Sequence, residues 1–175
     1  IKIDNSGYVL NPFSIIGHSR LVTDGSQEIH ENNQPVIKDG TVCIHNDIVT
    51  NVKELWKKNT HFTRQYDIDT EIIPKLLKHS LNDSSNITLA LKKTFDTIDG
   101  MSSIAMFFDD IDILLIATNN GSLYIGEDTK SGLVIFSSER YTLESLSRKY
   151  FFRKKIKNLN INKINPGSGY VININ

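Results

Sequence analysis

Gly17-His18-Ser19-Arg20-Leu21 is the first of four short motifs that decide the fold of this chain. The other three follow in order: Glu31-Asn32-Asn33-Gln34-Pro35, His45-Asn46-Asp47-Ile48-Val49 and Asp67-Ile68-Asp69-Thr70-Glu71. Their guanidinium, carboxylate and carboxamide groups can bind the charged ends of a free amino acid. They come from separate segments with an apolar strand between them, so we expect them to converge on one binding pocket.

The residues around these motifs predict loops, strands and helices in alternation. We expect an extended loop over residues 23–38, which are polar, and a buried strand over residues 41–45. Asn51 and Glu54 have the spacing of a capping pair, which predicts a short helix ending near Asn59.

Two longer helices are predicted from apolar residues at helical spacing. The first begins at Asp69 or Thr70, where Asp69 or Glu71 can accept hydrogen bonds from the free amides of the first turn. The second begins at Asn86 and stops at Gly100. Its apolar stripe, which we interpret as core, consists of Ile87, Leu91, Phe95 and Ile98.

After Met101 the apolar pattern takes the period of strands. Four runs follow, separated by turn residues, and they predict an antiparallel meander: residues 102–108, 111–117, 122–126 and 132–137. A helix over residues 138–150 and a last strand over residues 169–174 complete an α+β domain built on antiparallel sheet.

The composition limits the class of protein. The chain has 175 residues, with 20 Lys and Arg against 20 Asp and Glu. This length fits one domain. Because positive and negative charges balance, the chain has no excess of positive charge that would bind nucleic acid or an anionic membrane surface. A basic cluster alternates with aromatic residues, and we interpret it as a solvated face or a partner contact: Arg148, Lys149, Arg153, Lys154, Lys155 and Lys157.

The cysteine and two histidines are interpreted as structural. One cysteine forms no internal disulfide, and no apolar run approaches the roughly 20 residues that span a bilayer, so we expect a cytoplasmic protein. Cys43 has apolar neighbours and is assigned to the core. His18 and His45 lack a third ligand at suitable spacing, so we expect them to be buried and hydrogen-bonded, with no metal and no cofactor.

Together the four motifs resemble the glutaminase domain of class II glutamine amidotransferases, as in glucosamine-6-phosphate synthase and asparagine synthetase. Their order and spacing match that domain, and residues 100–108 and 122–139 are similar to its sheet region. The resemblance covers residues 16–139.

This resemblance implies an N-terminal-nucleophile hydrolase fold, an αββα sandwich of two antiparallel sheets between helical layers. In that family a Cys at the first position attacks the side-chain amide of glutamine, with its own α-amino group as the base. Ammonia leaves, and a thioester is hydrolysed to glutamate. Here Ile1 stands first and only sixteen residues precede Gly17, so we expect the first strand and helix of the fold to be missing from this chain.

The resemblance also implies a role for individual residues. Arg20 would hold the substrate α-carboxylate, with Thr23 in the same substrate-binding set, and Asp69 would pair with the α-ammonium. The Asn46 side-chain amide and the backbone N–H of Asp47 would stabilise the oxyanion. Taken singly, Arg20 also fits a loop brace, Asp69 a helix cap and Asn46 a strand end.

Position 47 departs from the family pattern, which has Gly after the Asn. The Asp47 side chain would place negative charge near the oxygen that must be stabilised. This substitution puts the catalytic activity in question.

Three hypotheses remain open. We favour an enzyme: residues 1–175 form a single glutaminase-like domain, a fragment of a longer polypeptide, which hydrolyses glutamine to glutamate and ammonia for a synthase domain or partner. The second hypothesis, motivated by the missing Cys and by Asp47, is a non-catalytic relative that binds an amino acid or a partner protein. The third is an unrelated α+β interaction domain in which the motifs are coincidental.

Overall fold

Among the residues that the structure describes, eight strands form two antiparallel sheets. The structure is a computed structural model, and it describes residue 5 and residues 13–19, 28–148 and 159–174. The larger sheet has the order β1-β2-β3-β4-β8 and consists of β1 (Val36–Lys38), β2 (Thr41–Val49), β3 (Gly100–Phe108), β4 (Ile113–Thr118) and β8 (Ser168–Asn173). The smaller sheet has the order β6-β5-β7 and consists of β5 (Tyr124–Asp128), β6 (Leu133–Ser137) and β7 (Asn160–Lys163).

Strands β2 and β3 form the centre of the larger sheet. Their register pairs Thr41 with Phe108 and Val49 with Gly100. Gly100 has φ +105°, and a Cβ there would lie 2.2 Å from the Ile48 carbonyl oxygen. Only glycine therefore lets the two strands stay paired up to this point.

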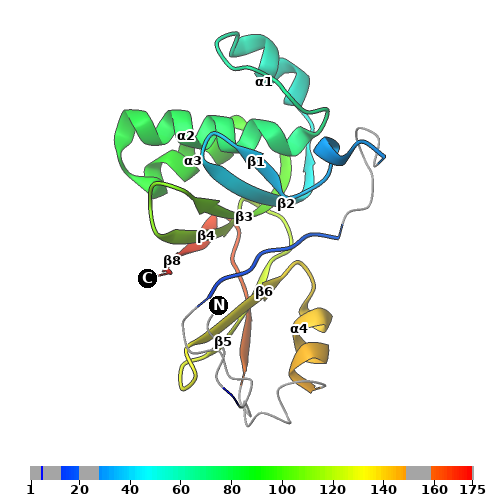
Figure 1. Cartoon of the computed structure of the whole chain (residues 1–175), viewed down its shortest axis with the longest axis vertical. Coiled ribbons are helices and arrows are strands. Elements are labelled where there is room, and N and C mark those ends of the chain that lie inside the picture. Colours follow the sequence, from blue (N-terminus) through cyan, green and yellow to red (C-terminus); the bar gives the residue numbers. More distant parts are fainter. Residues whose placement is uncertain (1–4, 6–12, 20–27, 149–158, 175) are drawn as a thin grey trace.

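The molecule is layered, with helices outside both sheets (Figure 1). Helices α2 (Ile72–Ser84) and α3 (Ile87–Thr97) pack on one face of the larger sheet, and α1 (Val52–Lys58) contacts α2 and adds Val52 and Leu55 to the same core. Helix α4 (Arg140–Leu146) packs on the smaller sheet. One apolar core lies between the larger sheet and its helices, and a second lies between the two sheets. The arrangement confirms the predicted α+β class and the predicted sandwich of two sheets between helical layers.

The predicted meander is wrong in its connectivity. Its four runs form two hairpins in different sheets, because β3 pairs with β4 in the larger sheet whereas β5 pairs with β6 in the smaller one. The remaining sides of β4 and β5 pair with β8 and β7, which come much later in the chain. Alternation along a strand shows which residues are buried but not which sheet the strand joins.

The helix-start predictions have mixed outcomes. Asn86 caps α3 as predicted, because its Oδ1 accepts a hydrogen bond from Leu89 N at 3.0 Å. Asn51 precedes α1 but makes no side-chain cap; its amide instead binds the Thr97 carbonyl and the Asp99 N–H. The predicted capping pair is therefore wrong, because the side chain joins two distant segments.

Three further segments differ from the predictions. The described part of the predicted loop at residues 23–38 contains a 3₁₀ turn, η1 (His30–Asn32), and the strand β1. Strand β7 was not predicted, and α4 begins at Arg140, two residues after the start of the predicted helix, whose last two residues lie outside the described residues. Apart from Arg148, the basic cluster lies outside the described residues.

Two predictions about burial and membranes can also be checked. Cys43 is fully buried in the core below the helices, as predicted. In the part of the chain that the structure describes, every helix is too short or too polar to cross a bilayer.

Candidate functional site

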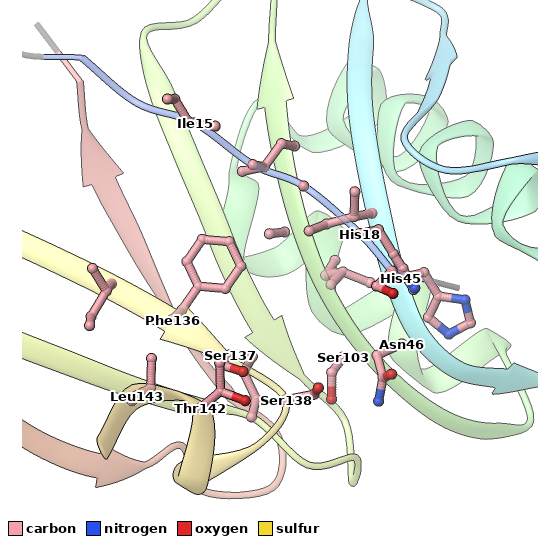
Figure 2. A pocket seen from close by; sticks show the side chains of 18 of the residues that line it. Ile15, His18, His45, Asn46, Ser103, Phe136, Ser137, Ser138, Thr142 and Leu143 are labelled. Carbon is pink, nitrogen blue, oxygen red and sulfur yellow. The ribbon is translucent and has the colours of Figure 1, made fainter. Parts of the chain in front are cut away.

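Asn46 lines a cavity of about 550 Å³ between the two sheets. The walls come from residues 15–19, strands β2, β3 and β6, and helix α4, and Figure 2 shows these side chains around the hollow. Its polar lining residues are His18, Ser19, His45, Asn46, Ser103, Ser137, Ser138 and Thr142. A carboxamide supplies two N–H donors, so Asn46 can bind an oxygen that gains negative charge inside the cavity.

Ser103 holds the strand opposite Asn46 in place. The two residues are partners in the β2–β3 register. Ser103 Oγ lies 3.1 Å from Thr118 Oγ1 and donates to the Ser122 carbonyl at 3.1 Å. These contacts fix β3, β4 and the turn after β4 together beside Asn46.

Asp47 follows Asn46 and has a left-handed backbone, with φ +86°. Its Oδ2 atom is buried and has no hydrogen-bond partner among the described residues. A Cβ built on Gly121 would lie 2.3 Å from this atom and 2.4 Å from Ser103 Oγ. The Asp47 carboxylate thus occupies space that only a glycine at position 121 leaves open.

Asp69 lies at the end of β2 but is not one of the residues that line the cavity. It begins the 3₁₀ turn η2 (Asp69–Glu71), and its Oδ2 accepts a hydrogen bond from Val49 N at 2.9 Å. It is 6% exposed. The prediction that Asp69 or Glu71 caps the following helix is wrong, because neither makes a side-chain cap.

His45 contacts Asp69 on the helix-facing side of β2. Its Nδ1 lies 3.9 Å from Asp69 Oδ2 and 3.4 Å from Thr70 Oγ1. Burial lowers the pKa of His45, and the nearby Asp69 carboxylate opposes this shift. The predicted burial of His45 is confirmed, whereas His18 is only partly buried.

The motif at residues 31–35 supports the site without lining the cavity. The Gln34 side chain accepts a hydrogen bond from His45 N at 2.6 Å and donates one to His45 O at 2.8 Å. It thus binds the β2 backbone as the backbone of a neighbouring strand would. Asn32 Oδ1 accepts from Asp67 N at 2.8 Å. These amides connect three of the four motifs by direct hydrogen bonds.

The predicted site residues are therefore placed in part. Asn46 and Asp47 lie together at the end of β2, and Asp69 binds the same strand two residues further on. Arg20 and Thr23 lie outside the described residues. The binding roles of all five residues stay predictions.

The sequence reasoning missed Ser103, Gly121 and the β6 wall of the cavity. Ser103 and Gly121 belong to runs and turns that we interpreted only as sheet. A glycine directly after Asn119-Asn120 signals a turn, but nothing local to it indicates contact with residue 47.

Comparison with known proteins gives a consistent result. Residues 18–145 match the family described as "Glutamine amidotransferase domain". The glutamine–fructose-6-phosphate aminotransferase (isomerizing) of Thermococcus kodakarensis is 33% identical over 116 residues, which cover 63% of this chain and 19% of that protein. The enzyme of the same name from Gluconobacter oxydans is 30% identical over 157 residues, covering 85% of this chain and 25% of that protein.

Solved structures show the same fold. Glutamine phosphoribosylpyrophosphate amidotransferase from B. subtilis, complexed with ADP and GMP, superimposes with a TM-score of 0.65 at 21% identity over 89% of this chain and 32% of that chain. This likeness confirms the predicted N-terminal-nucleophile hydrolase fold. The chain spans a quarter or less of the length of the two aminotransferases. The family match covers most of the chain, and we conclude that this chain belongs to the glutamine amidotransferase domain family.

Proposed function

We propose that this domain hydrolyses the side-chain amide of glutamine to glutamate and ammonia, and that the ammonia passes to a synthase domain or subunit. The observation that carries the proposal is the position of Asn46, whose carboxamide lines the cavity between the sheets in a member of this family. We further propose that residues 1–175 are one domain of a longer cytoplasmic polypeptide. The greater length of the relatives supports the proposal of a longer polypeptide.

The proposed roles follow the chemistry of the substrate. Arg20, with Thr23, binds the α-carboxylate, and Asp69 binds the α-ammonium. The Asn46 amide and the backbone N–H of Asp47 stabilise the oxyanion that forms when the side-chain carbonyl is attacked. The placement of Asn46 on the cavity wall, with Asp47 next to it in β2, supports the oxyanion assignment.

The reaction needs a thiolate that Cys43 does not supply. Cys43 is the one cysteine of the printed sequence, and it is fully buried among apolar side chains. Burial raises the pKa of its thiol far above the usual value, so it stays protonated. In our proposal the nucleophile is a Cys outside the printed sequence, and the cavity beside β6 is the space that its segment enters.

Asp47 is the observation that favours a second function. Its buried carboxylate oxygen directly follows Asn46 in the chain and opposes the accumulation of negative charge on a nearby oxygen. A domain of this kind would bind glutamine or glutamate, or a partner protein, without hydrolysing the amide. This non-catalytic relative is the alternative to the enzyme.

One measurement separates these functions, and a second tests the amino-acid binding that both include. The first is to read the encoded residues before Ile1 and to assay ammonia release from glutamine by the complete polypeptide. We expect a Cys that processing exposes, and activity that replacing this Cys by Ala abolishes. Absence of such a Cys, with no ammonia released, would leave only the non-catalytic function.

The second measurement is calorimetric titration with glutamine and with glutamate. Both functions predict that Arg20→Ala weakens binding of both ligands by about tenfold or more, because a charge-assisted contact is lost. Lys92→Ala, which changes an exposed pair on α3, serves as the control. If neither ligand binds the complete polypeptide, amino-acid binding is refuted for both functions.

A further inference from the structure

A buried ion pair lies next to the segment that carries Asp69. Lys38 is the last residue of β1, and Glu71 is the last residue of η2. Their side chains are 4% and 0% exposed, and Lys38 Nζ lies 2.8 Å from Glu71 Oε1. Because burying two charges is costly, such a pair persists only where other hydrogen bonds satisfy its remaining atoms.

Glu71 uses its carboxylate to hold the loop that precedes it. Oε1 accepts a hydrogen bond from Gln65 N and Oε2 accepts one from Tyr66 N, each at 2.8 Å. Two successive backbone amides therefore end on one buried carboxylate. This contact fixes the path of the backbone at these residues.

Lys38 holds the same loop from the other side. Its Nζ donates to the Thr63 carbonyl at 3.1 Å and to the side-chain oxygen of Gln65. The Tyr66 ring centroid lies 5.6 Å from the same nitrogen, within the range of a cation–π contact. The ammonium is thus surrounded by groups of this one loop and by Glu71.

The loop leads directly to Asp69. Asp67 N is bound by Asn32 Oδ1, Ile68 is 1% exposed, and the Asp69 carboxylate then accepts from Val49 N. Each residue between the ion pair and Asp69 is held by burial or by a hydrogen bond. The Glu71 carboxylate thus ties both ends of the segment 65–71 together, and Asp69 lies within this closed segment.

We propose that Lys38 and Glu71 are positioning residues that set the place of the Asp69 carboxylate for the α-ammonium of the substrate. This inference rests on the proposed function, in which Asp69 binds that ammonium. Neither Lys38 nor Glu71 contacts the substrate. They act by fixing residues 63–66, which lie outside the four motifs.

The test compares two ligands that differ only in the α-ammonium. Calorimetry is performed on the complete encoded polypeptide, with its nucleophilic Cys replaced by Ala so that glutamine is not hydrolysed. The ligands are glutamine and glutaramate, which is glutamine without its α-amino group. Lys38→Met leaves Glu71 without its cation, and we expect the dissociation constant for glutamine to rise about tenfold or more, because small misplacements of a binding group are costly. Glutaramate binding should change by less than about twofold, because it makes no contact with Asp69.

Two controls define what a different result means. Lys78→Met removes another lysine with a carboxylate partner, Asp110, away from this loop, and it should leave binding of both ligands unchanged. In an Asp69→Ala background, Lys38→Met should add nothing further to the loss of glutamine affinity. If Lys38→Met does not fold, as circular dichroism will show, Gln65→Ala removes one partner of the ammonium at an exposed position and should show the same ligand dependence more weakly.

The outcomes also separate this inference from the proposed function. If Lys38→Met weakens glutamine and glutaramate equally, or weakens neither, the positioning role is overturned while glutamine binding stands. If the unmodified polypeptide binds neither ligand, the proposed function itself is refuted.

Discussion

The two faces of β2 use their polar residues in different ways. On the helix-facing side, His45 contacts Asp69 and Thr70, and on the same face of β1 Lys38 pairs with Glu71; these groups are buried and partnered. On the side that faces the smaller sheet, Asn46 lines a cavity of about 550 Å³. One face of the strand thus packs buried polar groups against one another, with Asp69 at its end, and the other face borders a hollow that leaves room for a ligand.

This difference indicates which polar residues stabilise the fold and which are available to bind a ligand. Buried charges that are fully bonded fix the backbone, and removing one partner leaves the other unsatisfied. A carboxamide at the wall of a cavity contributes little to the folded state and remains available to a ligand. Substitution of Lys38 or Glu71 should therefore lower stability as well as glutamine binding, whereas substitution of Asn46 should affect function with little loss of stability.

The largest effect is expected for Glu71→Ala. It leaves Lys38 buried without its carboxylate and removes the acceptor of two backbone amides, so the free energy of unfolding should fall by about 3–5 kcal/mol. The measurement is urea unfolding followed by circular dichroism. Asn46→Ala is the matched change on the other face, and it should cost less than about 1 kcal/mol. A larger loss for Asn46→Ala than for Glu71→Ala would contradict the comparison.

The next largest effect is expected for Gly121→Ala. The added methyl group would lie 2.3 Å from Asp47 Oδ2, so the free energy of unfolding should fall by about 1–3 kcal/mol. Asp47→Gly removes the carboxylate and also suits the left-handed φ at that position, so adding it should restore most of the loss. Urea unfolding of the single and double variants measures this coupling. Strictly additive effects would show that residues 47 and 121 do not contact each other.

A smaller effect is expected from the pH dependence of His45. Burial lowers its pKa below the ordinary 6.5. Because the unfolded state then binds the proton more tightly, His45 contributes stability above about pH 6.5 that is lost as the pH falls below it, at up to about 1.4 kcal/mol per pH unit. His45→Gln should flatten this slope when urea midpoints are compared between pH 7.5 and 5.5. An unchanged slope would mean that other groups account for it.

The smallest effect is expected for Lys92→Ala on α3. Lys92 and Asp96 form an exposed pair one helical turn apart, and such pairs contribute less than about 0.5 kcal/mol. The thermal unfolding midpoint should therefore stay within a few degrees of that of the unmodified protein. If Lys92→Ala lowers the unfolding midpoint as much as Glu71→Ala does, burial does not explain why the Lys38–Glu71 pair should matter more than the Lys92–Asp96 pair.

Much of the fold could be predicted because its signals are local. Apolar periodicity predicted β2, β3 and the helix α3, and Asn86 predicted the start of α3 because its side chain binds an amide three residues away. Asn51 had an equally good local pattern and was predicted wrongly. Its hydrogen-bond partners are backbone groups of residues 97 and 99, and no pattern in the sequence around Asn51 predicts these distant contacts.

The candidate site was also predictable only in part: the motif residues were predicted, but their long-range contacts were not. The motif order predicted that Asn46, Asp47 and Asp69 belong to one region, and the structure places all three along the last part of β2. The contact between Asp47 and Gly121 was not predictable, because it joins a residue of β2 to the connection between β4 and β5, far away in the chain. The Lys38–Glu71 pair was not predictable either, because the two residues are adjacent only after β1 and η2 have packed.

By itself, the sequence determined the family, the α+β class and the set of polar residues available for binding an amino acid, because motif order and side-chain chemistry are written along the chain. Tertiary structure alone decided which sheet each hairpin joins, which polar residues face the cavity and which are buried as structural bonds. The physical reason is that strand pairing, burial and charge pairing depend on residues far apart in the chain, and their energies exist only once those residues are in contact.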